Sequence, residues 1–328
     1  MFYIFRIYWF CCLMIGSFGH AREKGCHMSV GTAFIHQPAL EQLQMKFDPE
    51  YGIMWYYMDP KPRPCFTLGL LKDIRKCQLF IEQINRSEST KGVECPIRYG
   101  VLASKFPGVY SFGGDLHLFL KLLREKNEAE LREYACACID VVFPNYAMCL
   151  DFPITTLSLV QGDALGGGFE SALSSNLIIA EKSARFGLPE VLFNLFPGMG
   201  AYNLLARRLD PKRAEQIVLS GNMYSATELH DMGVVDVVAE DGEGEKALNE
   251  FVARHARKRN TYQSFHKVRQ SYAPISYGEL LEVALIWVEA ALRLGEKDFR
   301  VMERLLKAQD RLSNGLSGVG GMRGEGYA

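Results

Sequence analysis

Residues 155–180 read TTLSLVQGDALGGGFESALSSNLIIA and contain the pattern that best indicates the fold class. Residues 155–160 are mostly apolar or β-branched, which predicts a strand. The chain then meets three consecutive glycines at 166–168, helical spacing over 169–175, and a second apolar run at 177–180. A strand, a glycine turn, a helix and a further strand in this order are typical of an α/β fold with crossover connections.

The same alternation extends to the N-terminal side of this stretch. Residues 51–58 (YGIMWYYM) and 98–103 (RYGVLA) predict two further strands. Residues 116–142 carry apolar side chains at helical spacing with a charged interruption, which predicts two helices. On the C-terminal side, residues 201–209 and 212–219 predict a helix pair.

The C-terminal third changes character, because its periodicity is almost entirely helical. Residues 279–310 are interrupted only by Gly295. We therefore expect an α/β core at 28–235, a helical C-terminal region at 240–313, and a flexible glycine-rich tail at 314–328.

Composition excludes several classes of protein. The chain has 328 residues, 48% hydrophobic and 23% charged, with 37 Lys+Arg against 38 Asp+Glu. This is typical of a globular protein, and a net charge of −1 gives no electrostatic footprint for nucleic acid. The nine cysteines lack the spacing of a zinc site, so we expect no metal and read them as reduced thiols of a cytoplasmic protein.

The first 27 residues stand apart from this pattern. They are apolar and aromatic, and Gly19-His20-Ala21 resembles a signal-peptide cleavage site. The apolar core is nevertheless short for a membrane span, and Met28 begins sequence of globular type. We interpret residues 1–27 as a dispensable extension or a mis-assigned start, and we expect no membrane span.

Two glycine turns are candidates for binding a polarised carbonyl. Gly113-Gly114-Asp115 and Leu165-Gly166-Gly167-Gly168 each open a predicted helix. One backbone N–H group from each turn would suffice to bind an oxyanion. Asp115 could instead serve only as a helix N-cap, and either turn could be purely structural.

Two glutamates accompany these turns. Glu170 follows the second glycine cluster on the first turn of its helix, and Glu190 comes twenty residues later in FGLPE. A carboxylate pair can divide the roles of general acid and general base, or hold a water between them. His117 is more simply explained as a surface residue of a helix, and the chain has no G-x-S-x-G nucleophile motif.

These segments resemble the crotonase superfamily of enoyl-CoA hydratases and isomerases, in residues 111–116 (SFGGDL) and most specifically in 161–202. GLPEVLFNLFPGMGAY, LSGNMYSATEL and IWVEAALRLGEKDFR further resemble the diffusible signal factor synthases of bacterial quorum sensing. The resemblance covers roughly residues 45–312. It implies a spiral of ββα units with a helical C-terminal extension.

The resemblance also implies roles for particular residues. It places the oxyanion amides at Gly114 and Gly167 and the catalytic carboxylates at Glu170 and Glu190, with either glutamate as the base. Superfamily isomerases and decarboxylases often lack one acid, so the presence of both favours hydration or dehydration. The neighbouring residues implied to contact substrate are Gly113, Gly166, Gly168, Leu165 and Trp287, although Trp287 could equally be a core residue.

The implied activity is dehydration of a 3-hydroxyacyl thioester of acyl carrier protein to a cis-2-enoyl thioester, followed by hydrolysis to a free fatty acid signal. An enoyl-CoA hydratase of β-oxidation, acting on CoA thioesters, and a catalytically silent binding protein remain as alternatives. The resemblance implies no cofactor, a possible sensor-kinase receiver domain as partner, and assembly as a homotrimer or hexamer.

Overall fold

The computed structural model describes residues 27–30, 33–92, 94–151 and 154–319. The predicted extension 1–27 and the end of the glycine-rich tail lie almost entirely outside these residues. The chain divides into two compact units at Ala39. The first contains an antiparallel pair of strands, β1 (His27–Val30) and β2 (Ala33–His36). Everything below concerns the second unit, which begins at Leu40.

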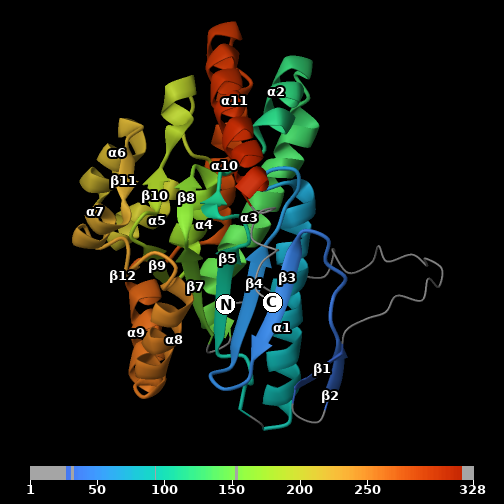
Figure 1. Ribbon diagram of the computed structural model, residues 1–328, viewed down its shortest axis with the longest axis vertical. Coiled ribbons are helices and arrows are strands. Elements are labelled where there is room, and N and C mark those ends of the chain that lie inside the picture. The colour runs from blue at the N-terminus through green and yellow to red at the C-terminus, as the bar shows by residue number, and fades with distance from the viewer. Residues whose placement is uncertain (1–26, 31–32, 93, 152–153, 320–328) are drawn as a thin grey trace, which may run out of the picture. The chain divides into compact units, whose positions relative to one another are not determined.

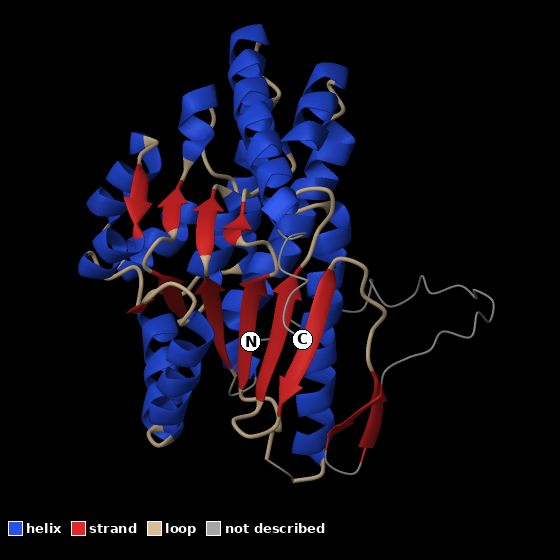
Figure 2. Cartoon of the chain, in the orientation of Figure 1, coloured by secondary structure: helices blue, strands red, loops and turns tan. Residues whose placement is uncertain are grey.

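The second unit contains a six-stranded sheet in the order β12-β9-β7-β5-β4-β3 (Figure 2). Only the β3–β4 pair is antiparallel. The strands run over β3 (Leu43–Asp48), β4 (Ile53–Met58), β5 (Tyr99–Ser104), β7 (Thr155–Val160), β9 (Leu177–Glu181) and β12 (Val237–Ala239). The predicted strands are confirmed, with the first beginning two residues later than expected.

Side chains alternate across this sheet and build two apolar layers. Ile53, Trp55 and Tyr57 of β4 face the same layer as Leu248 and Val252 of helix α8 (Gly244–Ala256). The opposite face lies against two long helices, α1 (Leu68–Thr90) and α3 (Glu128–Asp151). The central strands are buried on both faces, as their continuous apolar sequences require.

A second, four-stranded sheet has the order β11-β10-β8-β6. It consists of β6 (Gly108–Ser111), β8 (Gly162–Leu165), β10 (Arg185–Gly187) and β11 (Met223–Ser225). The chain alternates between the two sheets, so β5–β6, β7–β8 and β9–β10 are successive pairs, the first two followed by helices. This is the expected spiral of ββα units, and its smaller sheet escaped prediction because its strands have only three or four residues.

Helices fill the connections and form the C-terminal third, as predicted. Asp115 caps α2 by accepting hydrogen bonds from the N–H groups of His117 and Leu118 at 3.1 and 3.2 Å. Figure 1 shows α11 beside α2 at one end of this unit and α8 with α9 at the other. The remaining elements are α2 (Leu116–Glu125), α4 (Gly167–Ser174), η1 (Pro189–Phe193), α5 (Ala201–Arg208), α6 (Pro211–Ser220), α7 (Ala226–Asp231), α9 (Arg259–Tyr272), α10 (Tyr277–Ala291) and α11 (Glu296–Val319).

Candidate active site

The candidate site is assembled by three parallel strands of the small sheet. β8 lies between β6 and β10 and is parallel to both. The carboxyl ends of parallel strands meet at one edge, so the segments that follow them come together. Gly114 follows β6, Gly167 and Glu170 follow β8, and Glu190 follows β10. Residues far apart in the chain therefore gather at one end of this sheet.

The two glycine turns pack directly against each other. Gly113 has φ +87°, and a Cβ atom there would lie 2.6 Å from the Leu165 carbonyl oxygen and 2.8 Å from the Gly167 nitrogen. A Cβ atom on Gly168 would lie 2.5 Å from the Ser111 carbonyl oxygen. Side chains would separate the turns at both positions. Gly113 and Gly168 thus permit close packing of the two turns and are not among the residues that line the cavity.

The Gly114 and Gly167 backbones both line the cavity. A Cβ atom at Gly167 would point into the space between the turns, 3.5 Å from the Gly114 nitrogen and 2.9 Å from the Met199 sulfur. Among the described residues, no acceptor takes a hydrogen bond from either N–H group. Gly167 is also the first residue of α4, where the helix dipole favours negative charge. This geometry suits an oxyanion.

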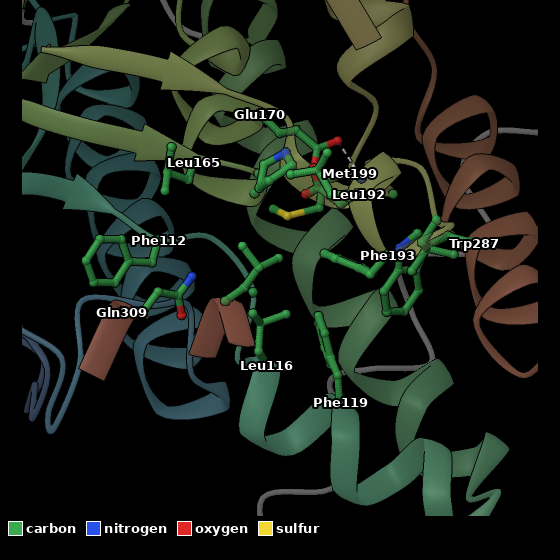
Figure 3. Close-up of a pocket in the computed structure, with 18 of the residues that line it drawn as sticks. Phe112, Leu116, Phe119, Leu165, Glu170, Leu192, Phe193, Met199, Trp287 and Gln309 are labelled. Carbon is green, nitrogen blue, oxygen red and sulfur yellow. Dashed lines mark hydrogen bonds between the residues drawn. The ribbon is translucent and has the colours of Figure 1, made fainter. Parts of the chain in front are cut away.

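Glu170 lies almost wholly buried on α4, with 1% of its surface exposed. Its Oε1 atom accepts a hydrogen bond from the N–H group of Met199 at 2.8 Å (Figure 3). It accepts a second from the N–H group of Ala201 at 2.9 Å. Burial raises the pKa of this carboxyl, the nearby Glu190 raises it further, and the two N–H donors oppose the shift. Glu170 is therefore held in place while its charged form is destabilised.

Glu190 lies in η1, where it is partly buried. Its Oε2 atom is enclosed and has no hydrogen-bond partner among the described residues. Burial raises the pKa of this carboxyl as well. Gly166, with φ +51°, makes room for it, because a Cβ atom there would collide with Glu190 Oε1. Burial thus disfavours the charged form of both carboxyl groups, and the charge of Glu190 disfavours it further at Glu170.

The glutamates and the two amides open onto a cavity of about 300 Å³. Its wall is otherwise mainly apolar, and Figure 3 shows Phe119, Phe193 and Trp287 together at one side. Trp287 comes from α10, and its ring centroid lies 5.1 Å from that of Phe119. The lining residues that the sequence did not reveal include Leu116, Phe119, Tyr134, Cys138, Leu192, Phe193, Met199, Met223, Leu305, Gln309 and Leu312.

The structure brings together Gly114, Leu165–Gly167, Glu170, Glu190 and Trp287, which all line the same cavity. Cys138 also lines the cavity, but burial raises the pKa of its thiol, so it is a poor nucleophile at neutral pH. His117 is exposed and lies 3.7 Å from Asp310, as expected for a surface residue. No cluster of metal-ligating side chains occurs in the part of the chain that the structure describes.

Comparison with known proteins identifies the family. Residues 76–273 match the enoyl-CoA hydratase/isomerase family model, which is more than half of the chain. The chain therefore belongs to the enoyl-CoA hydratase/isomerase family, within the crotonase superfamily. No helix in the described ranges has the length and apolarity needed to cross a membrane.

Relatives and solved structures agree with this assignment. The chain is 30% identical over 191 residues to enoyl-CoA isomerase/hydratase fer4 of Mycosarcoma maydis, covering 57% of this chain and 65% of that protein. It is 29% identical over 207 residues to human mitochondrial enoyl-CoA hydratase domain-containing protein 2, covering 63% and 65%. The match thus spans about two thirds of these relatives.

The crystal structure of enoyl-CoA hydratase from Bacillus halodurans shares the fold. The two superpose with a TM-score of 0.68 at 17% identity, covering 80% of this chain and all of the other.

Proposed function

We propose that this protein makes a cis-2-unsaturated fatty acid signal, by dehydrating a 3-hydroxyacyl thioester on acyl carrier protein and then hydrolysing the thioester. One observation carries the proposal. The carboxyl of Glu170 and the enclosed Oε2 atom of Glu190, both on side chains with raised pKa values, lie at an apolar cavity together with two amide N–H groups that have no acceptor among the described residues. The likeness of residues 187–202, 219–229 and 286–300 to diffusible signal factor synthases supplies the direction of the reaction and its product.

The dehydration step follows from this arrangement. The Gly114 and Gly167 N–H groups bind the thioester carbonyl oxygen and stabilise the enolate that forms when the ionised glutamate removes a proton from C2. The electron pair of that C–H bond forms the C2–C3 double bond as the C3–O bond breaks. The protonated glutamate gives its proton to the departing hydroxyl, which leaves as water, and the carboxyl pair again holds one proton.

Hydrolysis uses the same groups. A glutamate removes a proton from a water molecule, whose oxygen attacks the thioester carbonyl carbon. The amide groups stabilise the tetrahedral oxyanion. The C–S bond then breaks, the carrier thiol takes up the proton, and the free enoic acid leaves. The cavity wall binds the acyl chain and excludes bulk water from the carboxyl pair.

The test offers purified protein a medium-chain 3-hydroxyacyl thioester on carrier protein and measures the free acid by mass spectrometry. We expect cis-2-enoic acid to form. Glu170→Gln and Glu190→Gln should each reduce turnover by roughly 10²–10⁴-fold with the fold retained, since each removes a proton-transferring group at nearly constant shape. Near-normal turnover in either folded variant would overturn the two-carboxylate mechanism.

The second candidate is an enoyl-CoA hydratase of fatty acid β-oxidation. The family match favours it, because the relatives named above are enoyl-CoA hydratases and isomerases. The same carboxyl pair would then add water to an enoyl-CoA and leave the CoA thioester intact. Accumulation of 3-hydroxyacyl-CoA without free acid would select this candidate, and absence of turnover of any thioester would favour a pure binding protein.

Location and assembly are proposed on related grounds. Acyl thioesters of CoA and carrier protein are cytosolic, so we place the protein in the cytoplasm. We propose that it uses no cofactor and that a sensor-kinase receiver domain is a further partner.

We also propose that the protein assembles as a homotrimer or a pair of trimers. Helix α9 supports self-association, because Phe265, Val268 and Tyr272 expose 60%, 59% and 90% of their surfaces.

A further inference from the structure

Helix α11 presents two different faces. Its side chains Leu305, Ala308 and Leu312 line the cavity. Residues three or four positions apart lie on one side of a helix, so this spacing defines a single face. Ala308 and Leu312 are also exposed, and Leu312 retains 50% of its surface. This part of α11 therefore forms one edge of the cavity mouth.

The adjacent face of α11 is cationic. Arg300, Arg304, Lys307 and Arg311 are spaced by four, three and four residues, and all four are exposed. Three of them immediately precede a cavity-lining residue, so this face borders the mouth. The four residues span about 17 Å at 1.5 Å per residue. We call Arg300, Arg304, Lys307 and Arg311 the cationic stripe.

Acidic neighbours within the protein do not neutralise the stripe. Glu303 forms an ion pair with Arg124 at 2.5 Å. Asp310 lies 3.5 Å from Arg63 and 3.7 Å from His117. In contrast, no carboxylate of the described residues forms an ion pair with any member of the stripe. These two α11 carboxylates pair with basic residues elsewhere in the unit, and the stripe is left exposed.

Apolar side chains complete the rim. Leu192 of η1 and Met223 of β11 line the cavity and also expose 53% and 44% of their surfaces. An apolar rim beside a row of like charges suits a macromolecular partner, because apolar burial supplies affinity while charge supplies steering and orientation. Glu170 and Glu190 line the same cavity as these rim residues.

We propose that the cationic stripe docks an acidic acyl carrier protein, whose acyl thioester then enters the cavity at the mouth that α11 borders. The inference rests on the proposed function, since it takes the substrate to be a thioester on a carrier. Charge complementarity selects the occupant. Four cations spread along about 17 Å match a row of carboxylates on a protein surface, whereas the phosphates of CoA are concentrated near one nucleotide.

The test is a double charge reversal, Arg304→Glu with Arg311→Glu. Its matched control is Lys46→Glu with Lys72→Glu, which changes net charge equally at exposed residues of β3 and α1 that do not line the cavity. Each protein is assayed with one 3-hydroxyacyl group carried on carrier protein, on CoA and on pantetheine. Binding of acyl carrier protein is measured separately by fluorescence anisotropy at several salt concentrations.

We expect the stripe variant to raise KM and Kd for the carrier-protein substrate at least tenfold, with kcat and the pantetheine reaction unchanged. The wild-type affinity should fall with added salt, and the control should behave as wild type. Unchanged carrier binding in the stripe variant would overturn the proposal. If the stripe variant lost activity equally with the CoA thioester, but not with the pantetheine thioester, the stripe would instead bind the nucleotide phosphates of CoA.

These readouts separate the proposal from the proposed function. If wild-type protein releases no free acid from any thioester, the synthase function fails. Carrier binding that is salt-sensitive and lost in the stripe variant would still support the docking surface. If the protein releases free acid but binds the carrier protein equally well with and without the stripe, the proposed synthase function stands and the proposed docking surface is wrong.

Discussion

At high pH the carboxyl pair lowers the stability of the folded protein, because burial disfavours the charged form of Glu170. The pKa of Glu170 is raised in the folded protein, first by burial and then by Glu190, while unfolding restores an ordinary carboxyl. The stability associated with its protonated form is therefore complete below the unfolded pKa and is lost as pH rises through the folded pKa. Function and stability oppose each other at this residue.

Glu170→Gln should accordingly stabilise the protein, by an amount that grows with pH. The amide oxygen can still accept from the N–H groups of Met199 and Ala201, but the side chain cannot ionise. We expect unfolding free energies close to wild type near pH 4.5 and a gain on the order of 1–2 kcal/mol by pH 8.5. Denaturation at both pH values measures the difference.

Glu228→Gln provides a control of opposite sign. Hydrogen bonds from Ser225 lower the pKa of Glu228 in the capping box of α7. Its contribution is present above the unfolded pKa and is lost as pH falls through the lower folded pKa, so the amide should destabilise the protein at pH 8.5 and lose this effect in strong acid. A Glu170→Gln protein that is less stable than wild type at pH 8.5 would contradict the assigned shift.

Gly167 should tolerate no side chain. A valine there would crowd the Met199 sulfur and fill the space beside the Gly114 amide. Loss of an oxyanion contact typically costs about 3–4 kcal/mol of transition-state stabilisation, so we expect kcat to fall roughly 10²–10³-fold. Steady-state kinetics measure the loss, with circular dichroism as the check on folding.

Gly295→Ala is the matched glycine control for this variant. No atom lies within 4 Å of a Cβ placed at Gly295, and its φ is not in the left-handed region. Activity should therefore be unchanged. Wild-type activity in a folded Gly167→Val protein would show that Gly167 is a structural turn only.

At the scale of elements, α10 contributes Trp287 to the wall of the cavity. Trp287 packs against Phe119, and Gly198 gives its indole room, since a Cβ atom at Gly198 would lie 2.5 Å from Trp287 Cδ1. Trp287→Ala should lengthen the cavity, shift the preferred substrate to longer acyl chains, and cost about 3–5 kcal/mol of stability. Competition between thioesters of different length measures the preference.

Val288→Ala separates cavity shape from stability. Val288 is fully buried on the same helix but does not line the cavity. It should destabilise the protein without altering chain-length preference. If both variants changed the preference equally, Trp287 would be only a core residue.

At the scale of the whole molecule, the exposed face of α9 should hold subunits together. Phe265→Asp with Tyr272→Asp places charge on this face, and we expect the oligomer to dissociate into smaller species because a buried unpaired charge is strongly unfavourable. Sedimentation velocity measures the change. Leu79→Asp, at an exposed apolar residue of α1, should leave assembly intact. An unchanged oligomer in the double variant would place the interface elsewhere.

The large elements follow from the sequence for a physical reason. β4, β5, β7 and β9 are long enough to show continuous apolar runs, and α10 and α11 are long enough to show helical periodicity. The strands of the small sheet are too short to show such a pattern. A strand of three or four residues contains less than two periods of alternation, so β6, β8, β10 and β11 leave no distinct pattern.

The chemical groups of the candidate site can be read from the sequence: the glycine turns at 113–114 and 166–168 and the acids Glu170 and Glu190, without a G-x-S-x-G nucleophile motif. Which of these groups lie close together depends on the folded structure. The parallel pairing of β6, β8 and β10 brings Gly114, Gly167 and both acids to one edge. That pairing also packs Gly113 and Gly168 against the other glycine turn and its strand, because backbone atoms there leave no room for a Cβ atom at either position. Cavity walls from α2, α3, α10 and α11 likewise depend on contacts between distant segments, which no local pattern records.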